Sequence, residues 1–457
     1  MTDFLDQPAF ETSAAIASGA LDPVDLMRAT LARIADRNPK ANAIVSLRDE
    51  ADLLRAAEAA RDGPRKGWLH GMPLAVKDLA NVKGLPTSMG SPALAGTIAG
   101  KTDLFVQRMI DAGAIIIGKT NTPEFGLGSH TYNPVFGATQ NALRSGMSAG
   151  GSSGGAAVAL AHGMVSIADG SDMMGSLRNP AGWNGVYGMR PTWGRVPPEA
   201  EGDLFHHHLA TSGPMARTPH DVAMLLETQS GPNPSHPYQW PAEVYHDKLD
   251  VDLCGRRIGW LGDWGGAYPM EDGVLETTTN AVHRFANLGC EVIALDAPFS
   301  RDALWESWTT LRSWAVATGL GPLYDNAKTR GQLKPEAIWE IEKGRGLTAT
   351  QIARANSLRS DWYRAAASMF TTVDAAVLPT AQCWPFPVEW TWPKDIAGQS
   401  MDTYHRWMEV VLPCGLIGLP CLAVPIQGVP MGLQLIGKTG DDLNLLQLGQ
   451  GWHKLGV

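Results

Sequence analysis

The chain has 457 residues, of which 44% are hydrophobic and 18% are charged, and its formal net charge is -9. This composition is typical of a globular protein with a sizeable core. The acidic balance and the lack of any basic block argue against nucleic acid or an anionic membrane surface as the main partner.

The cysteines and the N-terminus indicate the compartment. The five cysteines are an odd number without Cys-x-x-Cys spacing, so neither a disulfide framework nor a zinc site is expected. Residues 1–11 carry two aspartates and a glutamate, unlike the basic start of a signal peptide. No run of about eighteen apolar residues occurs, so no membrane span is expected. We therefore expect a cytoplasmic protein.

The first part of the chain alternates between the two kinds of regular structure. Helical periodicity predicts helical structure at 13–35, where Asp22-Pro23 opens a helix, and helices at 48–62, 104–113 and 156–162. Short apolar runs predict strands at 74–76, 114–117 and 165–168. Irregular loops are expected at 145–155, where five of eleven residues are glycine, and at 169–178. This alternation predicts a sheet with helices on its faces.

The second part has weaker signals. Strands are predicted at 257–261, 290–295, 375–378, 422–425 and 432–436, and helices at 275–288 and across most of 300–370. The segment 383–410 is rich in Trp and Pro and is expected to begin irregularly. No linker divides the chain, so we expect one domain over 1–457, with a more variable helical and Trp-rich cap at about 290–405.

Two glycine-rich loops contain serines, and one predicted strand leads into a lysine. Ser152 and Ser176 lie in the loops, and Lys77 follows the strand at 74–76. A serine hydroxyl is a good nucleophile only when a base takes its proton. Lysine can be that base if burial keeps it neutral. Glycines leave backbone N–H groups uncrowded for an oxyanion, although an isolated Gly/Ser loop is better explained as a flexible turn.

Three segments in order resemble the amidase signature family: residues 71–78, 150–155 and 170–180. Lys77 precedes Ser152 by 75 residues and Ser176 follows Ser152 by 24, intervals that are also similar to the family's. The resemblance covers about 15–220 and 410–450. It implies an α/β amidase-signature fold, in which a mixed central β-sheet is flanked by helices on both faces.

The resemblance also implies a role for each matching residue. Ser176 would be the nucleophile, Ser152 a bridging serine next to a cis peptide bond, and Lys77 the base. The backbone N–H groups of the oxyanion hole would belong to Met173, Met174, Gly175 and Ser176. The residues that support the loops would be Ser153, Asp172 and Arg178. Met174 replaces the family's usual glycine, which affects substrate identity more than the chemistry.

The expected activity is hydrolysis of amide C–N bonds through an acyl-enzyme, with no cofactor and no metal. The substrate would be a small amide or carbamate. Trp384, Trp390 and Trp392 lie among prolines and could line a mouth that favours apolar or aromatic groups. The alternatives are a glutaminase subunit of a transamidation complex and a non-catalytic binding protein on the same fold. The natural substrate, the leaving group and any homo-oligomer stay open.

Three further motifs favour simpler explanations. Residues 113–120 match the nucleotide-binding P-loop pattern, but their apolar run predicts a strand, so an ATPase is a weaker alternative. His206–His208 are adjacent, and alternating side chains of a strand would not converge on one metal, so a surface or pocket-rim loop is expected. Glu340 and Glu342 are expected on an exposed helix face with no role beyond solvation.

Overall fold

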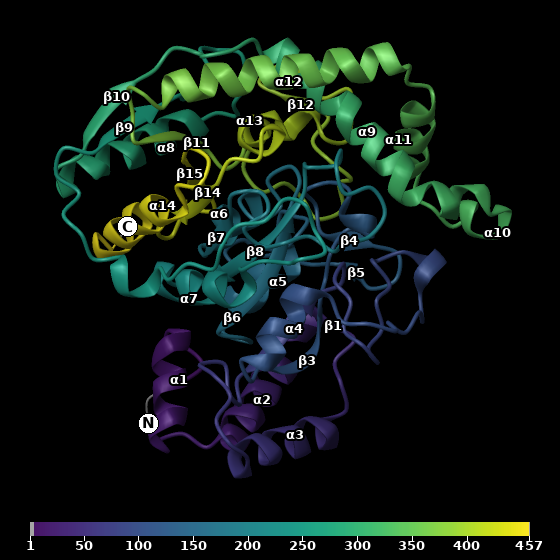
Figure 1. Cartoon of the computed structure of the whole chain (residues 1–457), viewed down its shortest axis with the longest axis vertical. Helices are drawn as coiled ribbons and strands as arrows, with labels where there is room; N and C mark the ends of the chain where they lie inside the picture. Colours follow the sequence, from purple (N-terminus) through teal and green to yellow (C-terminus); the bar gives the residue numbers. More distant parts are fainter. Residues whose placement is uncertain (1–3, 457) are drawn as a thin grey trace.

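The computed structural model describes residues 4–456 and is built around an eight-stranded sheet (Figure 1). The strand order is β10-β9-β11-β15-β14-β7-β8-β6. β9 pairs in parallel with β10 and β11, and the remaining neighbours are antiparallel. The strands are β6 (Ile167–Asp172), β7 (Tyr187–Arg190), β8 (Thr211–Ala216), β9 (Arg257–Trp260), β10 (Glu291–Ala294), β11 (Ala375–Pro379), β14 (Cys421–Pro425) and β15 (Gly432–Ile436). The mixed sheet predicted for the α/β fold is confirmed.

A separate three-stranded sheet has the order β1-β3-β2. It consists of β1 (Ile44–Val45), β2 (Pro73–Lys77) and β3 (Ile115–Thr120), with β2 parallel to β3. All residues of β2 and β3 are buried. The strands predicted at 74–76 and 114–117 therefore exist, but they form their own sheet. Two short hairpins, β4 (Tyr132–Asn133) with β5 (Gly137–Ala138) and β12 (Asp395–Ile396) with β13 (Gln399–Ser400), lie in the loops.

Helices cover both faces of the large sheet. Successive side chains of a strand point to opposite faces, and β14 shows what each face meets. Leu422 reaches so close to Gly449 of α14 that a Cβ there would lie 2.3 Å from its Cδ2 atom. Its neighbour Ala423 packs in the cluster that contains α5 and Ala181 of α6. The flanking helices are α5 (Gly154–Ala161), α6 (Asn179–Asn184), α7 (Pro219–Gln229) and α14 (Asp442–Lys454).

Four N-terminal helices lie in the lower part of the molecule in Figure 1: α1 (Ala9–Ser18), α2 (Pro23–Ala41), α3 (Glu50–Asp62) and α4 (Leu104–Asp111). α2 and α3 pack on the small sheet, whereas α1 and α4 contact α7. The helical structure predicted at 13–35 is divided between α1 and α2, and α2 begins at Pro23, where a helix was expected to open. Gly19 ends α1 with φ of 75°, and the Asp22 side chain accepts the Val24 N–H to cap α2.

The segment between β10 and β11 is helical and forms the upper edge of the molecule in Figure 1. Its longest helix, α9, packs against both α11 and α12. The members of this segment are α9 (Arg301–Asp325), α10 (Ala327–Arg330), α11 (Pro335–Arg345) and α12 (Ala349–Met369). The helix predicted at 275–288 is α8 (Val274–Val282) followed by a 3-10 turn at His283–Leu288, and α13 (Leu412–Leu416) precedes β14. No helix within residues 4–456 is long and apolar enough to cross a membrane.

Candidate active site

Lys77 ends β2 and is 1% exposed. Its Nζ atom lies 2.8 Å from the Oγ atoms of both Ser152 and Ser153, and 3.0 Å from that of Ser171. Burial lowers the pKa of Lys77 to about 7, against the opposing pull of the Asp169 and Asp172 carboxylates. A large fraction of the amine is therefore neutral at neutral pH and able to accept a proton.

Ser152 lies in a loop that leads into α5, and the peptide bond between Gly151 and Ser152 is cis. Gly150, at φ of 73°, is too close to its neighbours for a larger residue, because a Cβ would lie 2.3 Å from Asn179 Oδ1. Thr131 Oγ1 donates to the Gly150 carbonyl at 2.7 Å. These contacts fix the loop so that the Ser152 hydroxyl faces Lys77.

Ser176 lies in the turn between β6 and α6, and Asp172 organises that turn. The Asp172 carboxylate accepts the N–H groups of Gly175 and Leu177 at 3.0 and 3.1 Å, and Arg178 Nε at 2.9 Å. Burial alone would raise the pKa of Asp172, but the adjacent guanidiniums of Arg178 and Arg190 bring it well below its usual range. The carboxylate is therefore ionised and holds both sides of the turn.

The two serine loops contact each other through Ser153. Its N–H donates to the Ser176 carbonyl at 3.3 Å, and its hydroxyl accepts the Ser171 N–H at 3.3 Å. The Ser176 hydroxyl makes no hydrogen bond to any residue within 4–456, and Ser176 is 6% exposed. Lys77, Ser152 and Ser176 thus lie in one site, with the hydrogen bond formed between the first two and the Ser176 hydroxyl left free.

The predicted oxyanion donors differ in availability. The Gly175 N–H is used by Asp172, and a Cβ on Gly175 would lie 2.6 Å from Val411 Cγ2, so this position requires glycine. Within residues 4–456, the N–H groups of Met173, Met174 and Ser176 have no hydrogen-bonding partner. Three backbone donors at this turn are therefore available to a ligand.

A buried ionic network lies behind Met173. The Arg312 guanidinium contacts Met173 Sδ at 3.0 Å, Glu340 Oε1 at 2.7 Å and the Tyr404 hydroxyl at 2.7 Å. Glu340 also accepts the Ser313 hydroxyl at 2.5 Å. The expectation that Glu340 is a solvated surface acid was wrong, since Glu340 is 0% exposed. Arg312 was not predicted, because its partners Met173, Glu340 and Tyr404 come from distant segments.

The P-loop match at 113–120 does not form a phosphate loop, because most of it is β3. Lys119 is buried, and its Nζ atom bonds to the Ala80 carbonyl and to Thr87 Oγ1 at 3.1 Å. The Asp78 carboxylate lies 3.9 Å away from the same ammonium. Lys119 is thus a buried structural residue of β3, the strand that pairs with the strand carrying Lys77.

His206–His208 lie in a loop, as predicted. His206 Nδ1 contacts Asp203 at 2.7 Å, and His208 stacks on Trp193 with ring centroids 4.0 Å apart. Within residues 4–456, no group of three or more His, Cys, Asp or Glu side chains is arranged to hold a metal ion.

The tryptophans of the segment 383–410 do not line a single surface. Trp384 Nε1 donates to the Asp272 carbonyl at 3.0 Å, beside the start of α8. Trp392 instead lines a hollow of about 240 Å³ with Trp339 and Tyr404. Tyr404 also contacts Gly128, where a Cβ would lie 3.5 Å from its ring.

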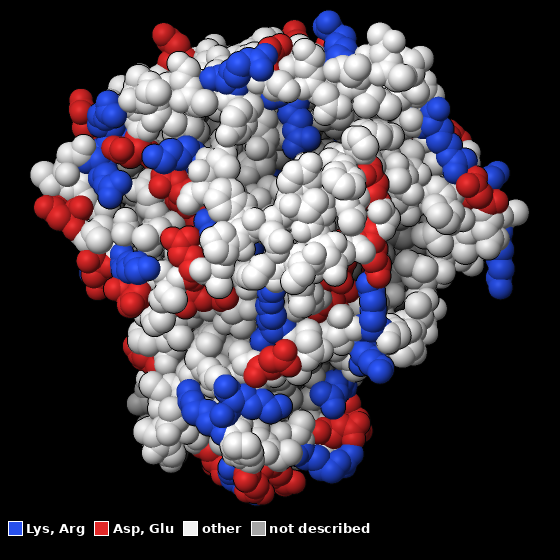
Figure 2. Space-filling model, viewed as in Figure 1, with Lys and Arg blue, Asp and Glu red and all other residues white. Residues whose placement is uncertain are grey.

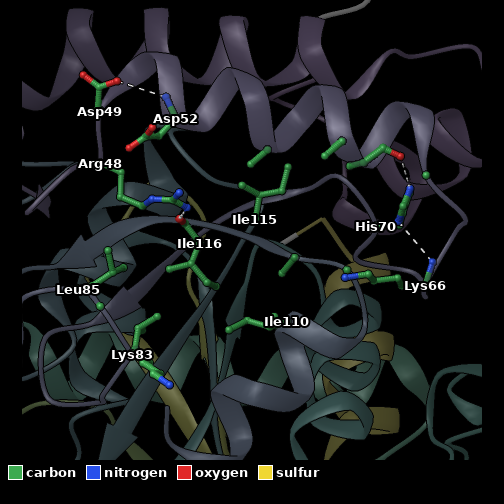
Figure 3. Close-up of a pocket in the computed structure, with 18 of the residues that line it drawn as sticks. Arg48, Asp49, Asp52, Lys66, His70, Lys83, Leu85, Ile110, Ile115 and Ile116 are labelled. Atoms are coloured by element: carbon green, nitrogen blue, oxygen red, sulfur yellow. Dashed lines mark hydrogen bonds between the residues drawn. The ribbon is translucent and has the colours of Figure 1, made fainter. Parts of the chain in front are cut away.

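A larger cavity, of about 700 Å³, lies in the N-terminal part between α3, α4 and β3 (Figure 3). Its walls include Ile110, Ile115 and Ile116, and Arg48 closes one side by donating to the Ile116 carbonyl at 2.8 Å. None of the predicted site residues lines it. On the face shown in Figure 2, basic and acidic side chains are interspersed around a largely uncharged middle.

Comparisons with known proteins agree over nearly the whole chain. The family model described as Amidase matches residues 25–446. An acylamidase of Rhodococcus erythropolis is 32% identical over 96% of this chain and 93% of its own length. A glutamyl-tRNA(Gln) amidotransferase subunit of Chloroflexus aurantiacus is 33% identical over 100% of this chain and 98% of its own length. The crystal structure of a bacterial aryl acylamidase of the amidase signature family has a TM-score of 0.92 and 26% identity, and the match covers 98% of this chain and 96% of that one.

Proposed function

The chain belongs to the amidase family and is a hydrolase of amide C–N bonds, and on that premise we propose that it acts through an acyl-enzyme on Ser176. One observation carries the proposal: the buried Lys77 amine lies 2.8 Å from Ser152 Oγ, with a pKa of about 7. A base with a pKa near the working pH is the most effective proton acceptor. The family match, the free hydroxyl of Ser176 and the available N–H groups beside it support the same assignment.

In the proposed mechanism, neutral Lys77 takes the Ser152 proton as Ser152 takes that of Ser176. Ser176 Oγ then attacks the amide carbonyl and forms a tetrahedral intermediate. Lys77 returns the proton through Ser152 to the leaving nitrogen, and the C–N bond breaks to give an amine or ammonia and the acyl-enzyme. Water attacks the ester by the same proton route, which releases the acid and restores Ser176.

The oxyanion would be stabilised by backbone donors. The N–H groups of Met173, Met174 and Ser176 are unpaired among the described residues and belong to the turn that carries the nucleophile. Backbone donors that are fixed before the reaction stabilise developing charge without reorganisation. Because a side chain does not remove the N–H, Met174 is compatible with this role. Its buried side chain would instead shape the substrate pocket.

The proposed substrates are small aryl or alkyl amides or carbamates with an apolar or aromatic group. Gly126 and Gly128, two residues apart in one loop, lie close to Ser152 and to Tyr404 of the aromatic hollow, respectively. A Cβ on Gly126 would lie 3.5 Å from Ser152 Oγ, and one on Gly128 would lie 3.5 Å from the Tyr404 ring. Beyond Tyr404, the hollow is lined by Trp339 and Trp392 together with Pro335, Glu336, Asp402 and Thr403. We propose that the cap at about 290–405 supplies these aromatic walls.

Paired variants and a substrate panel test the aromatic part of this proposal. We expect anilides and aromatic primary amides to be cleaved with a higher kcat/KM than short aliphatic amides. Trp392→Ala should raise KM for the aromatic substrates by about tenfold, since a well-packed aromatic contact contributes about 1 kcal/mol or more. Trp384→Ala is the matched control, because its ring lies against residues 271–273. Equal kcat/KM on small polar and bulky aromatic amides would contradict the proposed substrate class.

A second candidate function is the glutaminase subunit of a transamidation complex. The 33% identity with the amidotransferase protein of Chloroflexus aurantiacus over the whole chain is the observation that favours it. This function predicts ammonia release from glutamine and co-purification with partner proteins. We expect neither, because the hollow beyond Tyr404 has aromatic walls. Glutamine hydrolysis that is lost in Ser176→Ala and exceeds anilide hydrolysis would establish the second function instead.

A further inference from the structure

β6 presents different side chains to its two faces, because successive residues of a strand alternate. Asp172 points to the side of Arg178 and Arg190. Asp169 and Ser171 share the opposite face, and both meet Lys77. Ser171 Oγ lies 3.0 Å from Lys77 Nζ, and Asp169 Oδ1 accepts the backbone N–H of Lys77 at 3.0 Å. β6 therefore contacts Lys77 through the side chains of one face, and its C-terminal end leads into the turn that carries Ser176.

The Asp169 contact joins two sheets that share no strand pairing. β2 pairs only with β3, and β6 is the edge strand of the large sheet, where it pairs with β8. The Lys77 N–H faces this junction, where no ladder partner exists among the described strands. An unpaired buried N–H is destabilising, and the Asp169 carboxylate supplies the acceptor.

We propose that Asp169 is a positioning residue for Lys77, which fixes the end of β2 against β6 and keeps a negative charge beside the amine. This inference rests on the proposed role of Lys77 as the base. Asp169 does not touch the substrate in this account. It acts only through the location and the protonation of Lys77.

The charges around Asp169 explain why a carboxylate serves here better than a neutral acceptor. Asp169 is 1% exposed, and burial raises its pKa to about 6, although the Lys77 N–H and the charges of Lys77 and Lys119 oppose this shift. Lys119 comes from β3 and is itself balanced by Asp78 and Asp103. The charges of Asp169 and Asp172, which both belong to β6, raise the pKa of Lys77 against the effect of burial.

The charge of Asp169 thus prevents the pKa of Lys77 from falling further. A base with a much lower pKa would be a weaker proton acceptor at neutral pH. A neutral residue at position 169 could keep the backbone hydrogen bond but would lose this effect. The two roles of Asp169 can therefore be separated by experiment.

Asp169→Asn is the variant that separates them, because an amide oxygen can still accept the Lys77 N–H. The rate of Ser176 labelling by a fluorophosphonate is measured from pH 5 to pH 9 and depends on the activated hydroxyl rather than on any particular substrate. We expect the acid limb of this profile to move to lower pH by about one pH unit, because loss of the Asp169 charge disfavours the protonated amine. Asp169→Ser, also neutral, should shift the limb in the same direction if the Asn variant fails to fold.

Asp221→Asn is the matched control. Asp221 is also buried and accepts two backbone N–H groups, those of Ala9 and Phe10 at 2.9 Å each, but Lys77 is not among its partners. We expect the control to lose stability without moving the limb. A folded Asp169→Asn protein with the acid limb of the wild type would overturn the inference and leave Asp169 as a structural hydrogen-bond acceptor. A wild-type protein that is not labelled at any pH would instead contradict the proposed role of Ser176.

Discussion

Lys77 must be uncharged to accept a proton, so its ionisation should govern the pH dependence of the reaction. Burial lowers its pKa from an ordinary value of 10.5 to about 7. The protonated, inactive form dominates below this pKa and the neutral, active form above it. We expect kcat/KM on a neutral anilide to fall about tenfold per pH unit below pH 7 and to level off above it. A rise that continues to pH 10 would show that Lys77 keeps an ordinary pKa, and a flat profile from pH 5 to pH 9 would exclude it as the base.

Sequence patterns identified the candidate site residues of the two serine loops better than the residues that surround them. Lys77, Ser152 and Ser176 are recognisable because glycines and fixed intervals mark them. In the structure Lys77 contacts Ser152 directly, and Ser153 contacts both Lys77 and the backbone of Ser176. Asp169 and Ser171 carried no such mark, since residues 169–178 were expected to be one irregular loop. The strand in fact continues to Asp172. Once that is known, alternation alone assigns Asp169 and Ser171 to the face of Lys77.

Helix α11 shows how a charged side chain can belong to a core. Its buried residues Ala337, Glu340, Ile341 and Gly344 follow helical spacing on one face. Glu340 therefore lies on the face toward α9, whereas Glu342 points outward. The apolar periodicity of α11 already places position 340 on the buried face and position 342 on the exposed face. The charge of Glu340 nevertheless favoured the prediction of a solvent-exposed side chain. Its partner Arg312, on α9, could not be identified from local sequence, because 28 residues separate the two.

Glu340 should be important for stability, and Glu342 should not. Burial raises the pKa of Glu340, yet the charge of Arg312 and the contact with His405 outweigh burial and keep it well below its usual range. Glu340→Gln would leave the buried Arg312 cation without its counter-charge. We expect a loss of about 3 to 5 kcal/mol in the free energy of unfolding, measured by urea denaturation. Glu342→Gln, on the exposed side of α11, should change it by less than about 0.5 kcal/mol. Equal losses in the two variants would contradict this account of the network.

Element boundaries were predicted best where side chains mark them. Asp22 and Pro23 mark the start of α2, whereas the apolar spacing continues across both helices and conceals the end of α1 at Gly19. β7, β8 and α7 were not predicted, although β7 and β8 are almost completely buried. Buried antiparallel strands such as β8 contain Gly and Pro, which locally indicate loops. Their pairing with β6 and β7 depends on residues far along the chain.

The site as a whole lies between two sheets. Lys77 comes from the small sheet, Ser176 follows an edge strand of the large one, and Ser152 belongs to the loop before α5. Sequence order alone does not reveal that these sheets are separate, so one sheet was expected. The resemblance to the amidase signature family predicted the fold class correctly. The resemblance did not predict the positions of the two tryptophans. Trp384 packs near α8, whereas Trp392 lies beside Tyr404.

The central claim is that Ser176 is a nucleophile activated through Lys77. Labelling with a fluorophosphonate, read by intact mass and peptide mapping, tests it most directly on wild type, Ser176→Ala and Lys77→Met. We expect one adduct on wild type, located on Ser176, no adduct on Ser176→Ala, and labelling of Lys77→Met slowed by about 10² to 10⁴. Folded wild-type protein that remains unlabelled, or an adduct that persists in Ser176→Ala, would contradict the claim.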